Sequence, residues 1–254
     1  MNAEPVLVER RGPTLVLTLN TPGRRNVLGL STYPRLEALL EEAQVDPGVA
    51  NIILQGADGY FCAGGDLRVL ADLAAMPLAH NEAQIENLHR LVRSLRACPK
   101  PVIAAIEGGA AGAGASLAFA ADMIVAAEGS HFALSYVKAG LVPDGGATAF
   151  LHRALPPQFA AEMALLATPV PVERLAAMGV VNRVTPAGKA LEVALDLAAA
   201  LARGAREAQT EILELLDAAD REHFHGQLDR ERAGMARAIG SAEAAEGIAA
   251  FHQK

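Results

Sequence analysis

The sequence of 254 residues contains no tryptophan, and aromatic residues make up only 4% of it. A core for this chain must therefore be built from Ala, Leu, Val and Ile, whose small side chains let backbones approach closely. The 23 Gly and 14 Pro together make up about 15% of the 254 residues. This share is well below the roughly 25–30% that marks disordered or low-complexity chains. A chain of this length buries roughly 70–75% of its unfolded surface, so we expect it to fold without a disulfide or a structural metal.

Cysteine and long apolar runs are also scarce. Cys62 and Cys98 are the two cysteines, and they match no CxxC or zinc-binding spacing, so we expect reduced thiols in a cytoplasmic protein. The N-terminal residues lack the apolar stretch of a secretory signal. No apolar run approaches the ~18 residues of a membrane span, because Asp122 interrupts the longest small-residue stretch. We therefore expect no membrane partner.

Positive charge is in deficit. Lys and Arg number 22 against 29 Asp and Glu, which gives a formal net charge of −7. Nucleic-acid-binding domains carry a basic excess or a basic stripe, so we expect no nucleic-acid partner. The local basic spots at Arg24, Arg25 and residues 90–96 suit a small anionic ligand rather than a duplex.

Short apolar strands alternate with helices over the first part of the chain, a pattern typical of α/β proteins. From about residue 158 the pattern turns helical, with one last possible strand at 180–184. We place a soft boundary near residue 195, between a core of residues 1–195 and a helical region of residues 196–254. The apolar runs that predict strands are residues 6–8 and 14–19, joined as a hairpin, and residues 52–54, 102–106 and 123–127.

Two glycine-rich loops each join a predicted strand to a predicted helix. In Ala63-Gly64-Gly65-Asp66, adjacent glycines let a ligand approach the backbone amides, although this loop taken alone is more simply interpreted as a tight turn. The loop at residues 108–116 presents free N–H groups at a helix N-terminus. It matches neither GxGxxG nor a P-loop, and Ala118 stands where the nucleophile elbow GxSxG requires Gly. Close packing of helix on sheet is the alternative interpretation.

A third loop, Val142-Pro143-Asp144-Gly145-Gly146, carries an acid in apolar surroundings. Asp144 either caps the helix that begins near Gly145 or does acid/base chemistry. Two loops with donor amides and one isolated carboxylate are what enolisation of a thioester needs, namely an oxyanion hole and a general base.

These loops, in this order and spacing, resemble the crotonase (enoyl-CoA hydratase/isomerase) superfamily over nearly the whole chain. The resemblance implies a spiral of ββα units with a helical C-terminal part, residues 196–254, that assembles trimers or hexamers. It implies an acyl-CoA thioester as ligand, with coenzyme A as part of the substrate and no metal or redox cofactor. The matching stretches are residues 61–67, 99–108, 111–114, 121–122, 140–146, 179–182 and 247–251.

By position in the family pattern, the resemblance puts the amides of the oxyanion hole at Gly65 and Ala113, and an acid/base at Asp144. Asp66 is expected to face coenzyme A and to support its loop. The substrate-binding positions that the resemblance implies are Arg25, Val27, Ala63, Gly64, Asp66, Leu67, Gly112, Ser116 and Tyr136.

The departures from the family pattern bear on the activity. Hydratases of this family use two glutamates, and the matching positions here hold Ser116 and Tyr136. The Pro-Asp-Gly segment instead resembles a branch with ring-epoxide isomerases and Δ3,Δ2-enoyl-CoA isomerase-like enzymes, in which an Asp shuttles a proton, and with alternative oxepin-CoA hydrolases. The sequence favours an isomerase that uses Asp144. A hydratase or hydrolase with the same site, and a non-catalytic acyl-CoA-binding protein, stay open as alternatives.

Overall fold

A computed structural model describes residues 4–219 and 221–252 of the chain. Residues 1–3, 220, 253 and 254 of the two expected regions lie outside this description. A sheet of six strands forms the centre, and only its first pair is antiparallel. Its order is β1 (Val6–Arg11), β2 (Thr14–Leu19), β3 (Asn51–Gly56), β4 (Val102–Ile106), β6 (Met123–Ala127) and β9 (Arg183–Thr185).

The expected α/β class and the N-terminal hairpin are confirmed. The last strand begins later than the 180–184 expected from the sequence. Gly179 has a φ of +79°, a left-handed turn, and the amide of Asn182 bonds to the carbonyl of Ile124 before the ladder of β9 starts. Residues 179–182 therefore form the approach to the strand.

A second sheet of three short strands brings separate loops together. Its strands are β5 (Gly109–Ala111), β7 (His131–Ala133) and β8 (Val170–Pro171). Each of β5 and β7 follows closely on a strand of the main sheet, β4 and β6. An isolated bridge joins Cys62, which follows β3, to Ala110 in β5. The segments after three parallel strands consequently meet at one place.

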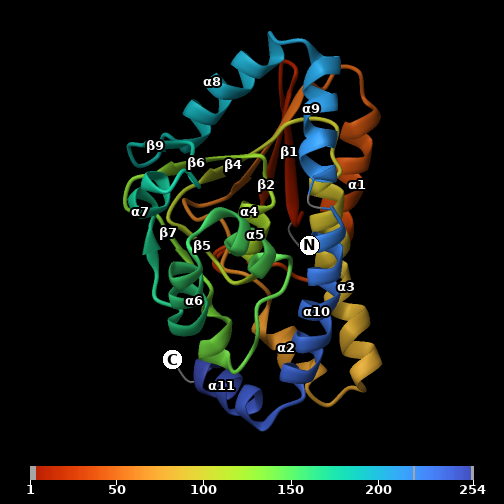
Figure 1. Ribbon diagram of the computed structural model, residues 1–254, viewed down its shortest axis with the longest axis vertical. Helices are drawn as coiled ribbons and strands as arrows, with labels where there is room; N and C mark the ends of the chain where they lie inside the picture. Colours follow the sequence, from red (N-terminus) through yellow and green to blue (C-terminus); the bar gives the residue numbers. More distant parts are fainter. Residues whose placement is uncertain (1–3, 220, 253–254) are drawn as a thin grey trace.

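Helices cover both faces of the main sheet (Figure 1). Successive strand residues point to opposite faces. On one face, Leu17 and Leu54 pack with leucines of α1 (Thr32–Val45) and α3 (Leu78–Arg96). On the other, Val16 and Ile53 pack under α8 (Ala190–Ala202), whose buried residues are all alanines spaced four apart. Small side chains at that spacing let the helix lie close to the sheet.

The C-terminal part is helical, as expected. α8 runs through residue 195, the expected boundary, and covers the sheet, so the purely helical part begins beyond Ala202. α10 (Arg221–Ile239) lies along α3 (Figure 1), and α11 (Ala242–His252) contacts the 3₁₀ helix η1 (Ser135–Ala139). In the described part of the chain, no helix is long and apolar enough to cross a bilayer. The remaining helices are α2 (Leu67–Leu73), α4 (Ala113–Phe119), α5 (Ala147–Ala154), α6 (Pro157–Leu166), α7 (Val172–Ala177) and α9 (Arg206–Ala218).

Candidate active site

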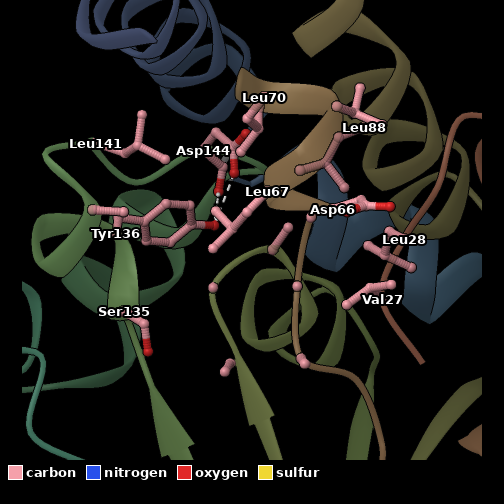
Figure 2. A pocket seen from close by; sticks show the side chains of 18 of the residues that line it. Val27, Leu28, Asp66, Leu67, Leu70, Leu88, Ser135, Tyr136, Leu141 and Asp144 are labelled. Atoms are coloured by element: carbon pink, nitrogen blue, oxygen red, sulfur yellow. Dashed lines mark hydrogen bonds between the residues drawn. The ribbon is translucent and has the colours of Figure 1, made fainter. Parts of the chain in front are cut away.

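A cavity of about 620 Å³ opens where the loops after β2, β3 and β4 meet α2, α3 and η1. Figure 2 shows this pocket from close by. Ser116 is the one sequence-predicted site residue that does not line it, because it is fully buried behind the wall. The predicted residues that do line it are Arg25, Val27, Ala63, Gly64, Gly65, Asp66, Leu67, Gly112, Ala113, Tyr136 and Asp144.

The two glycine-rich loops lie against each other at the cavity wall. The amide of Cys62 bonds to the carbonyl of Gly109 at 3.3 Å, and the amide of Ala111 bonds back to the carbonyl of Cys62 at 2.9 Å. Gly64 has a φ of +101°, and a Cβ added there would lie 2.8 Å from the carbonyl oxygen of Ala111. Only glycine fits at this contact, which fixes the relative position of the two loops.

Each loop brings one free amide to the cavity. Ala113 begins α4, so its N–H has no partner within the helix. Within residues 4–219 and 221–252, neither the N–H of Ala113 nor that of Gly65 donates a hydrogen bond. Both residues line the cavity. The wall therefore offers two N–H donors to an acceptor oxygen in the cavity.

Asp144 lies at the inner end of the cavity, which we define by Leu70, Leu88, Tyr136, Leu141 and Asp144 (Figure 2). It is 6% exposed, and the hydroxyl of Tyr136 donates to its Oδ1 at 2.8 Å. Burial raises the pKa of Asp144 to about 6, while the bond from Tyr136 acts in the opposite direction. A carboxyl group with such a pKa can take up and return a proton near neutral pH.

Ser116 supports this arrangement from behind. Its hydroxyl donates to the backbone carbonyl of Asp144 at 2.8 Å and lies 3.0 Å from the hydroxyl of Tyr136. Burial raises the pKa of Tyr136 well above its ordinary value, and the charge of Asp144 adds to that. Tyr136 therefore stays protonated and remains a hydrogen-bond donor to the carboxylate.

Asp144 is not the cap of the following helix. α5 begins at Ala147 with Gly146 as its N-cap residue. The cap comes from Glu231 of α10, whose Oε2 accepts from the amide of Gly146 at 2.6 Å and whose Oε1 accepts from the amide of Thr148 at 2.9 Å. The structure thus removes the capping role that the sequence left open for Asp144.

Two residues near Asp144 were missed in the sequence. His89 of α3 is fully buried, and its Nε2 accepts from the amide of Gly145 at 3.1 Å. Burial, together with the charge of Arg232, lowers the pKa of His89 to about 4. Its position on the apolar face of α3, four residues after Ile85, is a signal that the sequence carries. Glu231 had none, because it lies 85 residues from Gly146.

The opposite side of the cavity is charged; we call it the outer end and define it by Arg24, Arg25, Tyr60, Asp66 and His131. Arg24 and Asp66 form an ion pair at 2.6 Å. The guanidinium of Arg25 lies 5.2 Å from the ring centre of Tyr60, which makes an edge contact with His131. In Figure 2, Asp66 lies across the pocket from Tyr136.

Local sequence explains how the outer end is presented. Buried Asn26 bonds through its Nδ2 to the carbonyls of Ala57 and Tyr60, at 2.9 and 2.6 Å. These bonds hold the left-handed turn at Arg25 and leave its side chain exposed. Asp66 also accepts from the amide of Arg68 at 3.1 Å and so caps α2.

The described residues contain no cluster of three or more His, Cys, Asp or Glu side chains that could hold a metal ion. Cys62 and Cys98 are both buried free thiols. Burial raises the pKa of Cys62 to about 12, so this thiol stays protonated. The groups identified so far at the cavity wall are two backbone N–H donors, of Gly65 and Ala113, and the buried carboxyl group of Asp144.

Comparisons with known proteins agree with this architecture. A family model described as enoyl-CoA hydratase/isomerase matches residues 9–254. The 2,3-dehydroadipyl-CoA hydratase of Escherichia coli is 33% identical over 251 residues, which cover 98% of this chain and 96% of that protein. The 1,2-epoxyphenylacetyl-CoA isomerase of Escherichia coli is 33% identical over 241 residues, which cover 94% and 92%.

Solved structures share the fold along its length. An enoyl-CoA hydratase from a Polaromonas species superposes with a TM-score of 0.82 at 40% identity, and the match covers 98% of this chain and 96% of that one. The extent of the family match, the fold and the acyl-CoA relatives lead to one conclusion. This chain belongs to the enoyl-CoA hydratase/isomerase family and is an acyl-CoA enzyme with the crotonase fold.

Proposed function

We propose that this enzyme isomerises an acyl-CoA thioester by moving a proton within the acyl group, with Asp144 as the acid/base. The observation that carries the proposal is the environment of Asp144. It is the carboxylate at the inner end of the cavity, buried among leucines, with its pKa raised to about 6. A base of this kind removes a carbon-bound proton efficiently near neutral pH.

The two loop amides supply the complementary function. The N–H groups of Gly65 and Ala113 bond to the thioester oxygen and stabilise the negative charge that develops there. Asp144 removes a proton from the α-carbon, the electron pair passes to the thioester oxygen as an enolate, and the acid form of Asp144 returns the proton at the γ-carbon. The double bond shifts, and atoms and charge balance without a cofactor.

Hydration needs more than this site offers. Family hydratases place glutamates where this chain has Ser116 and Tyr136, and neither side chain is a carboxylate base. The hydroxyl of Ser116 donates to the backbone carbonyl of Asp144, and the hydroxyl of Tyr136 donates to its carboxylate. One carboxyl group is then left to activate water and to deliver the α-proton, which disfavours efficient hydration.

A hydratase or hydrolase remains the second candidate, because the 33%-identical relative from Escherichia coli is a 2,3-dehydroadipyl-CoA hydratase. In that reaction Asp144 is the base toward a water molecule. An acyl-CoA-binding protein without catalysis is the third, and it predicts thioester binding with no turnover.

Product mass separates the candidates. A panel of unsaturated acyl-CoA thioesters is incubated with the protein in deuterium oxide and analysed by mass spectrometry. We expect products with the elemental formula of the substrate, except that deuterium replaces hydrogen at the α- or γ-carbon. A product heavier by one water indicates hydration, release of free coenzyme A indicates hydrolysis, and binding without exchange indicates the non-catalytic candidate.

The outer end suits the anionic part of coenzyme A. Arg24 and Arg25 line it, and guanidinium groups are favoured partners of phosphate. The apolar inner end then takes the acyl group. We infer that coenzyme A enters as part of the substrate and that the reaction uses no metal or redox cofactor.

We infer likewise that copies of the chain assemble as a trimer or hexamer through residues 196–254. Residues Ile212, Leu215 and Leu216 of α9 are 54%, 61% and 60% exposed, an apolar face that an isolated chain leaves in water. Light scattering tests this inference, since a monomer across micromolar concentrations would contradict it.

A further inference from the structure

Glu231 is a buried carboxylate that lies outside the cavity wall. It is 5% exposed and sits on α10, more than eighty residues from the loop that it contacts. Its Oε2 accepts from the amide of Gly146, and its Oε1 accepts from both the amide and the hydroxyl of Thr148. One turn earlier on α10, the Nε2 of Gln227 donates to the Thr148 hydroxyl at 2.6 Å. A carboxylate and an amide of one helix thus bind the start of another.

The segment held in this way is the turn directly after Asp144. Gly145 and Gly146 both have left-handed backbones, with φ of +64° and +78°. A Cβ on Gly145 would lie 2.9 Å from Leu88, and one on Gly146 would lie 2.7 Å from Phe224. The turn is therefore tightly enclosed, and its path decides where Asp144 points.

Two helices hold successive peptide groups of that turn. His89 of α3 accepts from the amide of Gly145, and Glu231 of α10 accepts from the amide of Gly146. No local side chain caps α5, so Glu231 satisfies amides that would otherwise be buried without a partner. Burial raises the pKa of Glu231 to about 7, whereas the bonds from Thr148 and Gly146 favour its charged form.

The geometry points to Glu231 as a positioning residue for Asp144. It fixes the Gly145–Gly146 turn from behind, so that the carboxyl group of Asp144 stays bonded to Tyr136 and faces the acyl group. Glu231 does not line the cavity. This inference rests on the proposed role of Asp144 in proton transfer.

A double-mutant cycle tests the inference. Glu231→Gln keeps the size of the side chain but replaces one acceptor oxygen by a donor, so one amide loses its partner. Displacement of a reacting group by about 1 Å costs up to roughly 10²-fold in rate. We expect kcat for isomerisation to fall by about 10- to 100-fold, with the Kd for a saturated acyl-CoA such as hexanoyl-CoA changed by less than about threefold.

The second arm uses Asp144→Asn as background. If Glu231 acts through Asp144, adding Glu231→Gln there lowers the residual rate by less than about threefold, because coupled residues are not additive. Asp229→Asn, two residues away on α10 and outside the turn, is the matched control, and we expect wild-type kcat. Thr148→Val removes the hydroxyl that bonds to Glu231 and to Gln227 but keeps the amide that bonds to Glu231. We expect a smaller loss of kcat, also with Kd unchanged, and this variant replaces Glu231→Gln in the cycle if that variant does not fold.

The outcomes separate this inference from the proposed function. Wild-type kcat in folded Glu231→Gln, or an equal loss in both backgrounds, overturns the positioning role while Asp144 keeps its own. A rise in Kd equal to the fall in kcat/KM overturns it as well, since it places Glu231 in binding. Full activity of Asp144→Asn overturns the proposed function itself, and the inference with it.

Discussion

Two aspartates line the same cavity, and their surroundings move their pKa values in opposite directions. Burial raises the pKa of Asp66, but the bonds from Arg24 and the Arg68 amide outweigh it, and the net shift is downward. Burial raises the pKa of Asp144 to about 6, although the bond from Tyr136 and a bond to its own backbone act in the opposite direction. Asp66 is therefore a permanent anion that supports a loop, whereas Asp144 can carry a proton.

The difference lies in the partners rather than in the residue type. A cation at 2.6 Å stabilises the charged form of Asp66 at the outer end. The inner end surrounds Asp144 with leucines and one hydroxyl donor, which together replace only part of the solvation that the carboxylate loses on burial (Figure 2). One cavity thus combines a polar end suited to an anion with an apolar end suited to proton transfer.

Exchanging each aspartate for asparagine gives the largest expected effect. Asp144→Asn keeps the shape of the side chain and removes the base, and general acid–base catalysis contributes roughly 10²–10⁴-fold. We expect kcat to fall by that factor with little change in acyl-CoA affinity, measured by steady-state kinetics and by binding of hexanoyl-CoA. Asp66→Asn is the comparison: it weakens a loop and a cap, so we expect it to alter KM more than kcat. Equal losses of kcat in both variants would contradict the assignment of proton transfer to Asp144 and of a supporting role to Asp66.

Removing one donor amide comes next. Gly65→Pro deletes an N–H at the cavity, and loss of one oxyanion donor costs about 10²–10³ in rate. Gly65→Ala is a matched control, because Gly65 does not have a positive φ and a Cβ there would meet only Leu70 at 3.9 Å. We expect the alanine variant to keep its activity, with circular dichroism confirming both folds. Wild-type turnover of folded Gly65→Pro would refute the assignment of this amide.

Stability provides a test without substrate. The folded pKa of Asp144 lies above its ordinary value of 3.8, so ionisation costs the folded state, and the wild type loses stability as the pH rises from about 4 to about 6. Asp144→Asn cannot ionise. We expect urea unfolding to show the variant gaining about 3 kcal/mol relative to wild type between about pH 4 and pH 8. A pH-independent difference would mean that the carboxyl group is not perturbed.

The acyl group itself probes the inner end. An acyl chain that ends in a carboxylate would place a second anion beside Asp144, where the lining residues Leu70, Leu88 and Leu141 offer no cation. Burial of an unpaired charge is costly. We expect adipyl-CoA to bind about 10- to 100-fold more weakly than hexanoyl-CoA in calorimetry, an effect of roughly 1.4–2.7 kcal/mol. Equal affinities would show that the inner end is less apolar than its lining.

Local patterns in the sequence predicted most of the architecture. Short apolar runs located β1, β2, β3, β4 and β6, because a strand covered by helices on both faces of the sheet buries successive residues. Glycine pairs located the donor loops, since the contact of Gly64 with Ala111 admits no Cβ. The start of β9 was misplaced because its ladder depends on the distant β6.

The partners of Asp144 needed the structure. The sequence could not choose between a cap and an acid/base, since the cap is Glu231 on a distant helix and no local signal announces it. Ser116 and Tyr136 were identified only as positions without carboxylates. Their bonds to Asp144 depend on how α4, η1 and the Gly145–Gly146 turn meet in space.

The pH dependence of kcat/KM tests most directly whether Asp144 is the proton carrier. The rate of isomerisation is measured from about pH 5 to pH 8 for the wild type and for Asp144→Asn. The base must be ionised, so we expect the wild-type rate to fall as the pH drops through about 6, and the residual rate of the variant to lack this limb. A flat wild-type profile, or the same limb in both proteins, would contradict the account.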